Sequence, residues 1–273
     1  NSILQIVVFS VFFGIGLAAL GERGRGLIGV IDQVAHVMLK VTAYVMWTAP
    51  AAVLAAVAAT ITTEGLGILG TYGKFIGGYY VALLVLWAVL LGLGAMVIGP
   101  RVRALVSMIR EPLLLAFSTA SSEAAYPKTL EQLERFGVSP RIASFVLPLG
   151  YSFNLDGSMM YCTFATLFIA QAYGIDLSGT QLITLLLLLL VTSKGIAGVP
   201  RASLVVLAAT LPHFGIPDAG LLLVLAVDQF LDMGRSATNV VGNSIASSVV
   251  AKWEGELSDP QSVAGPVEPA GVG

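Results

Sequence analysis

Charged and amide side chains recur along one face of an apolar segment near the C-terminus. Their spacing of three or four residues places them on one side of a helix: Asp228, Asp232, Arg235, Asn239 and Asn243. A charge at the centre of a membrane helix costs about 2.5–3.5 kcal/mol, so the three charges need partners. A closed Asp232–Arg235 pair that holds helices together is one interpretation. We favour a zwitterion site, in which Arg235 holds a carboxylate and Asp232 accepts an ammonium group.

The stretch YSFNLDGSMMY, residues 151–161, places an amide and a carboxylate inside another apolar run. Gly157 lowers the cost of unwinding a helix there, and an unwound turn frees backbone carbonyls. Carbonyls beside the carboxylate of Asp156 suit a dehydrated monovalent cation, because hard cations prefer oxygen ligands. A buried, protonated Asp156 with a structural role is the alternative. We favour a coupling-ion site that includes Asn154 and Asp156.

Two segments rich in small and hydroxylic residues, 118–122 and 193–203, lie between apolar arms. In the first segment, Ser121 and Ser122 could offer hydroxyls and the free N–H groups of a helix N-terminus to an anion. In the second segment, Arg201 is either a charge that faces water or a second guanidinium for the ligand. We favour the water-facing interpretation.

The composition is typical of a membrane protein. Of the 273 residues, 56% are hydrophobic and only 11% are charged, with a mean hydropathy of +0.89; soluble domains are about a quarter charged. Apolar runs of about 18 or more residues indicate membrane helices, and they cover 2–20, 41–62, 75–99, 142–172 and 219–250. The net charge of −2 argues against a nucleic-acid partner, and the single cysteine excludes an internal disulfide. The sequence holds no HExxH or GxSxG motif, so we expect neither an enzyme nor a cofactor.

The distribution of basic residues predicts the topology. We assign the loops around 23–25, 99–110 and 128–141, which carry Lys and Arg, to the cytoplasm, and the loops 172–180 and 213–218, which carry none, to the outside. The apolar segments between loops on the same side must return to that side, and re-entrant helical hairpins do so. The sequence therefore predicts an all-α membrane protein with an inverted repeat of hairpin and broken span, as in secondary transporters. The predicted elements are a first hairpin at about 104–137, a broken span at 138–174, a second hairpin at about 180–214 and a last span at 218–252.

Four motifs resemble the dicarboxylate/amino acid:cation symporter family, which includes bacterial glutamate/aspartate carriers and animal excitatory amino acid transporters. They are AFSTASSEAAYP, NLDGS, SKGIAGVP and DMGRSATNVVGN. The resemblance runs from the end of the family's fourth helix onward, so the first three helices of the family are not in this chain. It implies the glutamate-transporter-homologue fold: a homotrimer in a bacterial plasma (inner) membrane, surrounded by lipid, with a transport domain that moves by an elevator. Residues 1–99 would form part of the scaffold, with their last helix shared, residues 100–257 the transport domain and residues 258–273 a disordered tail.

The resemblance also implies roles for individual residues. Arg235 would bind the side-chain carboxylate of the substrate and Asp232 its ammonium group. The remaining substrate-binding residues would be Ser121, Ser122, Ser158, Gly198, Val199, Ser236 and Asn239. The cation-binding residues, with Na⁺ as a possible metal, would be Gly150, Ser152, Asn154, Asp156, Ser193, Ile196, Asn239 and Asn243.

Two departures from the family pattern bear on substrate and coupling. The positions where the family often carries a further arginine are Ala120 and Met233, and Asn243 replaces the carboxylate of sodium-driven members. We therefore expect a symporter for glutamate and aspartate, coupled to protons, sodium or both, with protons favoured. Within the family, a carrier of C4-dicarboxylates such as succinate is the alternative, but Asp232 would repel a substrate without an ammonium group. Outside it, an ion channel is the alternative, although the polar residues converge on one site.

Overall fold

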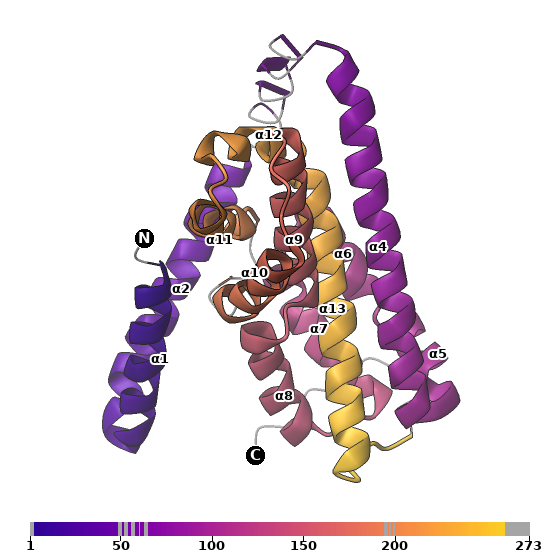
Figure 1. Cartoon of the computed structure of the whole chain (residues 1–273). Helices are drawn as coiled ribbons and strands as arrows, with labels where there is room; N and C mark the ends of the chain where they lie inside the picture. Colours follow the sequence, from indigo (N-terminus) through magenta and orange to yellow (C-terminus); the bar gives the residue numbers. More distant parts are fainter. Residues whose placement is uncertain are drawn as a thin grey trace.

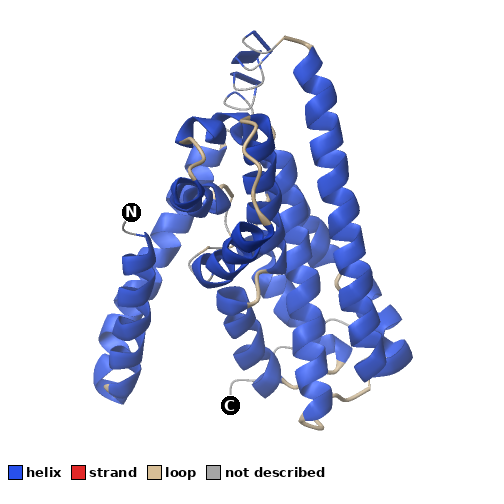
Figure 2. Cartoon of the chain, in the orientation of Figure 1, coloured by secondary structure: helices blue, strands red, loops and turns tan. Residues whose placement is uncertain are grey.

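The computed structural model describes residues 3–259, except for positions 49, 50, 52, 53, 56, 57, 60, 63, 64, 194, 195, 197 and 199. Figure 2 shows the described elements as helices joined by short loops. One isolated antiparallel bridge, between Val138 and Leu257, completes the secondary structure of this part of the chain. Most of the predicted C-terminal tail, residues 260–273, lies outside the described residues.

Two helices near the N-terminus stand beside the rest of the molecule. They are α1 (Ile3–Ala19) and α2 (Arg25–Met46), joined by a 3-10 turn at Gly21–Gly24. Figure 1 shows them as an antiparallel pair apart from the helices around α13. Large apolar side chains on this pair are exposed, among them Phe12 at 71%. Such a surface needs lipid or further protein to cover it.

The longest helix is α4 (Gly67–Ile98), which continues through a 3-10 turn into α5 (Val102–Met108). Among the described helices, this run of Gly67–Met108 is the one long and apolar enough to cross a membrane. The 32 residues of α4 alone extend about 48 Å at 1.5 Å per residue. Two shorter apolar helical segments are Gly179–Thr192 and Ala202–Phe214.

Two pairs of short helices follow in the chain. The first pair, α6 (Arg110–Thr119) and α7 (Ser122–Phe136), packs as a helical hairpin with its tip at Ala120 and Ser121. The hydroxyl of Ser121 caps α7 by accepting a hydrogen bond from the Ala124 N–H. The second pair, α8 (Pro140–Phe153) and α9 (Asp156–Ala172), is interrupted at residues 154–155, so the carboxylate of Asp156 lies in the first turn of α9.

A second hairpin precedes the last long helix. Its arms are α10 (Gly179–Thr192) and α11 (Ala202–Thr210), and its tip spans residues 193–201. The short helix α12 (Leu221–Leu225) then leads into α13 (Asp228–Trp253). In Figure 1, α13 runs through the middle of the molecule, and it packs against α4, α6, α7, α8 and α9.

Aromatic side chains of α4 hold it against the last helices. The hydroxyls of Tyr72, Tyr79 and Tyr80 donate hydrogen bonds to backbone carbonyls of residues 223, 231 and 230, and the indole N–H of Trp87 donates to the Thr238 hydroxyl at 2.8 Å. Tyr72 and Tyr79 are seven residues apart, and so are Tyr80 and Trp87. The two pairs therefore lie along neighbouring lines on one side of the helix. These hydrogen bonds range from buried at Tyr79 to exposed at Tyr80, and they fix the position of α4 against α12 and α13.

The polar part of α13 lies between two apolar clusters. One cluster gathers around Tyr79, Tyr161 and Leu207, and it includes Leu231. The other gathers around Phe136 and Leu147 of α7 and α8 and includes α13 residues from 241 onward. The segment 232–239 therefore carries its charges and amides at the junction of two dry cores, where charges without partners are costly.

The segment after α13 is tied to the α7–α8 connection. The Glu256 carboxylate accepts hydrogen bonds from the Ser139 hydroxyl and the Arg141 guanidinium. The Ser258 N–H donates to the Gly137 carbonyl at 2.8 Å. These contacts join residues more than 100 positions apart at one end of the molecule.

The Glu256 contact predicts a pH-dependent stability. Hydrogen bonds from Arg141 and Ser139 hold the pKa of Glu256 below its ordinary value. A lowered folded-state pKa stabilises the fold above the unfolded pKa of about 4.3, and this stability is lost as the pH falls through the folded value. We expect Glu256→Gln to lower the melting temperature near pH 7 but to match the unsubstituted protein once the pH lies below the lowered folded-state pKa of Glu256. Melting curves across this range measure the difference, and an equal deficit at both pH values would contradict the prediction.

Candidate functional site

An oppositely charged pair occupies the centre of the site. Asp232 and Arg235 are fully buried, and Arg235 Nε donates to Asp232 Oδ1 at 2.6 Å. The second carboxylate oxygen of Asp232 accepts from the backbone N–H of Arg201. This closed pair is the arrangement that the sequence left as an alternative to an open zwitterion site. Neither charge is exposed to solvent, so each depends on the other for compensation.

Both hairpin tips reach this pair through backbone groups. Ala120, at the tip of the first hairpin, has φ 52°, and its carbonyl accepts from Arg235 Nη2 at 3.3 Å. Arg201, at the tip of the second hairpin, has φ 64°, and its N–H donates to Asp232. Among the described residues, these are the two non-glycine residues with positive φ. The left-handed conformation costs about 1–2 kcal/mol per residue, so the rest of the site must hold both tips in place.

The two tips also contact each other. The Gly198 carbonyl accepts hydrogen bonds from the Ser121 hydroxyl at 2.9 Å and from the Glu123 N–H at 3.2 Å. A Cβ added to Gly198 would crowd the Ser122 hydroxyl and lie 3.0 Å from Glu123 Cγ. A glycine at position 198 therefore permits the close approach of the hairpins.

We expect Gly198→Ala to separate the tips. The added methyl group must displace the start of α7, and overpacking of this kind costs about 1–3 kcal/mol. Hydrogen exchange at the Glu123 amide should become faster, because its acceptor on residue 198 moves away. Gly73→Ala is the matched control, since a Cβ there meets no atom within 4 Å. Unchanged exchange at Glu123 in Gly198→Ala would show that the tip contact is not tight.

Amide and hydroxyl groups extend the site toward α9. Ser158 Oγ accepts from Asn239 Nδ2 at 3.4 Å and from Arg235 Nη1 at 3.5 Å. Asn239 Oδ1 accepts from the Gly157 N–H at 3.0 Å. The break between α8 and α9 thus leaves an N–H group of α9 available to a side chain of α13.

Two buried hydroxyls of the site lack hydrogen-bond partners within the described part of the chain. They belong to Ser122 and Ser236, which are fully buried. Buried polar groups are nearly always satisfied, so such atoms indicate where a guest would donate or accept. Val199, which the sequence also assigned to substrate binding, lies outside the described residues.

A second polar group lies where α8, α9 and α13 meet. Asn154 Nδ2 donates to Asn243 Oδ1 at 3.2 Å. A Cβ on Gly150 would collide with the Asn243 amide, and a Cβ on Gly242 would collide with the Asp156 carboxylate. The structure therefore brings together four of the residues predicted to bind a cation, with oxygen atoms from amides, a carboxylate and backbone.

Other residues predicted for cation binding are engaged by their own helices. The Ser152 side chain is exposed and donates to the Pro148 carbonyl at 3.2 Å. Ser193 is buried and donates to the Leu190 carbonyl at 3.3 Å, and the Ile196 N–H donates to the Ser193 carbonyl at 3.0 Å. In this conformation they belong to the second hairpin and to α8 rather than to the group around Asn243.

A further ion pair lies beside the Asp232–Arg235 pair and was missed in the sequence. Arg201 Nε lies 3.6 Å from Asp228 Oδ2, and the Tyr161 hydroxyl donates to Asp228 Oδ1 at 2.5 Å. The Arg201 side chain is 31% exposed, so the water-facing interpretation is only partly right. Asp228 starts α13, where the helix dipole favours a negative charge.

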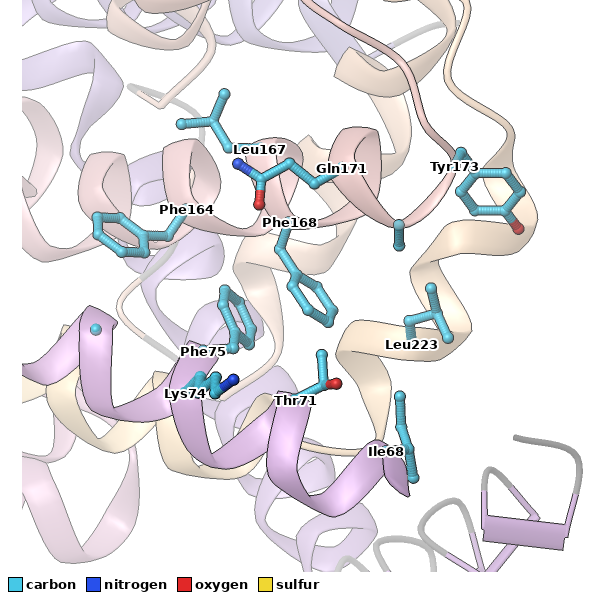
Figure 3. Close-up of a pocket in the computed structure, with 12 residues that line it drawn as sticks. Ile68, Thr71, Lys74, Phe75, Phe164, Leu167, Phe168, Gln171, Tyr173 and Leu223 are labelled. Atoms are coloured by element: carbon cyan, nitrogen blue, oxygen red, sulfur yellow. The ribbon is translucent and has the colours of Figure 1, made fainter. Parts of the chain in front are cut away.

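An open cavity lies apart from these charges. It has a volume of about 870 Å³ and lies between α4, α9 and α12. Figure 3 shows Phe75 and Phe168 facing each other in its wall, with ring centroids 4.1 Å apart. Its lining is mainly apolar, and the members with polar side-chain atoms are Thr71, Lys74, Gln171 and Tyr173. None of the charged residues of the site line this cavity, and Asp232 and Arg235 are fully buried.

The chain matches one known protein family and several proteins of that family. Residues 1–253 match the model of the sodium:dicarboxylate symporter family. The chain is 44% identical over 255 residues to a proton/sodium-glutamate symport protein of Bacillus subtilis (93% of this chain, 59% of the relative). It is 46% identical over 265 residues to a proton/glutamate-aspartate symporter of Escherichia coli (97% and 61%). It is 40% identical over 264 residues to a C4-dicarboxylate transport protein of Bacillus subtilis (96% and 63%). The chain thus spans about three fifths of the length of these relatives.

Proposed function

The chain belongs to the sodium:dicarboxylate symporter family, a family of membrane transporters, and from this premise we propose that it takes up glutamate and aspartate by cation-coupled symport. One observation carries the proposal: a buried Asp232–Arg235 pair lies where the tips of two helical hairpins meet. Opposite charges at such a point suit a small zwitterion that carries an extra carboxylate. The transporter relatives named for glutamate and aspartate support the same substrate class.

The closed pair defines what binding requires. In this structure Arg235 and Asp232 compensate each other. With substrate, we infer that the Arg235 guanidinium turns to the side-chain carboxylate and Asp232 accepts the ammonium group, so each charge exchanges one partner for another. The α-carboxylate would then accept from Asn239 and from the unpaired hydroxyls of Ser122 and Ser236. For the substrate to enter, the contact between the Gly198 tip and the first hairpin must open.

We further propose a membrane arrangement for the chain. The two hairpins, α6–α7 and α10–α11, would be re-entrant and related by an inverted repeat, with their tips at the middle of a bacterial inner membrane. Residues 100–257 would move as an elevator within a homotrimer, and α1, α2 and the outer face of α4 would meet lipid or partner subunits. The exposed apolar surface of α1 and α2 supports this assignment.

Coupling would use the group around Asp156 and Asn243. Its oxygen atoms suit Na⁺, but Asn243 is neutral, and a site with a single carboxylate binds a cation weakly. We therefore expect that a proton gradient alone drives uptake. Aspartate uptake into proteoliposomes that contain the natural full-length protein, under separately imposed Na⁺ and H⁺ gradients, tests the proposal. Concentrative uptake under either gradient supports symport, whereas passive equilibration with both gradients in place would overturn it.

We expect Asn243→Asp to increase Na⁺ stimulation of uptake by about tenfold. The added carboxylate would lie beside Asn154 and contribute one negative ligand to a partly buried cation. Initial rates at a series of Na⁺ concentrations measure the effect. Asn243→Ser removes the amide without adding charge and serves as the control. Equal Na⁺ responses in the two variants would place the sodium site elsewhere.

Transport of C4-dicarboxylates is the second candidate function, because C4-dicarboxylate transport proteins are 40–44% identical to the chain. A dicarboxylate offers no ammonium group to Asp232, which would then face like charges in a dry cavity. Competition decides between the two: unlabelled aspartate should block labelled aspartate uptake, and succinate should not. Stronger inhibition by succinate would favour the second candidate.

A further inference from the structure

We propose that Arg201 is a positioning residue of this site, whose guanidinium is the counter-ion of Asp228 while its backbone N–H holds Asp232. The inference rests on the proposed function for its transport readout. By this inference, the Arg201 guanidinium at the tip of the second hairpin is part of the charged site and does not simply face water.

Within the described part of the chain, Arg201 supplies the ion pair of Asp228. Asp228 and Tyr161 are fully buried, and the Tyr161 hydroxyl donates to Asp228 Oδ1 at 2.5 Å. The other oxygen, Oδ2, lies 3.6 Å from Arg201 Nε and makes no hydrogen bond to a described residue. The remaining buried guanidinium of the site, Arg235, is engaged by Asp232. Arg201 is therefore the group that compensates the Asp228 charge.

The backbone of Arg201 points to the same role. Its φ of 64° and ψ of 3° lie in the left-handed region, where glycine would be free of strain. A strained non-glycine residue persists when the surrounding structure requires its side chain or its conformation. Here the conformation directs the N–H to Asp232 and the guanidinium to Asp228 at once. One residue thereby contacts both carboxylates of α13.

The charge balance of the site then depends on hairpin closure. With the tip closed, Asp228 and Asp232 face Arg201 and Arg235, two negative and two positive charges. When the tip opens, the Arg201 guanidinium and N–H leave together. Of these four described groups, the two carboxylates and Arg235 then remain, so their summed charge is negative. An open site of this kind attracts a cation or an ammonium group, and closure restores neutrality.

A double-mutant cycle tests the pairing. The single variants are Arg201→Gly, which removes the guanidinium and relieves the backbone, and Asp228→Asn, and the third variant combines them. In the natural full-length protein, we expect Arg201→Gly to raise the KM for aspartate about tenfold or more, because Asp228 is left buried without a counter-ion. Adding Asp228→Asn should return the KM to within about threefold of the unsubstituted protein. Arg103→Gln, on α5 outside the charged site, is the control and should leave the KM unchanged.

The outcomes separate this inference from the proposed function. If Arg201→Gly transports like the unsubstituted protein, or if the two substitutions add their losses, Arg201 is not the counter-ion. If the unsubstituted protein takes up no aspartate, the proposed function fails, and the melting temperatures of the same four proteins still test the pair. Losses in melting temperature that do not add support the pairing, whereas additive losses, or a higher melting temperature for Arg201→Gly alone, overturn it.

The single cysteine reports hairpin opening independently. Cys162 is fully buried, and its Sγ lies 3.9 Å from the Ser203 carbonyl at the start of α11. Displacement of the second hairpin would expose this thiol. With any other cysteine of the natural protein replaced, we expect methyl methanethiosulfonate to modify Cys162 at least about threefold faster in Arg201→Gly, since the tip loses an ion pair. Equal rates would show that Arg201 does not hold the tip closed.

Discussion

Replacing Arg235 by glutamine is expected to abolish aspartate uptake and to lower the free energy of unfolding by about 3–5 kcal/mol. The substitution leaves the Asp232 carboxylate fully buried, and among the described residues the Arg201 N–H is then its remaining donor. It also removes the donor to the Ala120 carbonyl and one of the two donors to Ser158. Melting curves and proteoliposome uptake measure the two effects separately.

A charge-free variant of the pair separates stability from transport. In Asp232→Asn with Arg235→Gln no charge of the pair remains, so most of the lost stability should return. Uptake of acidic amino acids should not return, because the guanidinium proposed to bind the substrate carboxylate is gone. Arg235→Lys keeps the charge but not the fork geometry, and it should retain stability better than uptake. A stable, inactive double variant is the expected result, and unimpaired uptake by it would remove the pair from the binding site.

The polar face of α13 can be predicted from the sequence, by helical periodicity and by the free-energy cost of burying a charge. Spacings of three and four residues place Asp232, Arg235 and Asn239 on one side of a helix, and the structure brings all three to the Ser158 region. Because these polar side chains lie in an apolar chain, they must be buried against one another. These two rules need only local sequence. The side chains that α13 would meet are set by the packing of other helices.

The contacts that could not be predicted from the sequence join segments that are far apart along the chain. Arg201 is 27 positions before Asp228, and Tyr161 is 67 positions before it, so no periodicity relates the three. The hydrogen bond from Ser121 to Gly198 spans 77 positions and depends on how two hairpins meet. A tyrosine within an apolar helix is usually read as a core residue, which is why Tyr161 was missed. An acid at the start of α13 with an aromatic hydroxyl near it becomes visible only in three dimensions.

The break between α8 and α9 could be predicted from the local sequence, but its contacts with α13 could not. The sequence places a helix break near Gly157 from composition alone, and α8 ends at Phe153 while α9 begins at Asp156. The use of that break depends on α13. Gly157 N–H donates to Asn239, and the Asn154 amide donates to Asn243, so one break serves both polar groups of the site. A change at the break should therefore affect substrate and cation binding together.

Gly157→Ala is expected to reduce aspartate uptake by about 100-fold and to destabilise the fold by about 1–3 kcal/mol. A Cβ at residue 157 would approach the backbone of Arg235, with its Cα only 3.0 Å away. Backbone cannot rotate aside as a flexible side chain does, so α9 and α13 must separate. This movement lengthens the hydrogen bond from the Gly157 N–H to Asn239 and shifts Ser158 away from Arg235.

A matched substitution on another helix shows that the effect belongs to this contact. Gly92→Ala on α4 adds the same methyl group where a Cβ meets no atom within 4 Å. Because alanine favours helix over glycine by about 1 kcal/mol, this control should melt at an equal or higher temperature and transport normally. Helix propensity alone would predict the same gain for Gly157→Ala, so the two variants must move in opposite directions if close packing of α9 on α13 holds the site. Equal behaviour of the two would mean that the helices have room to spare at residue 157.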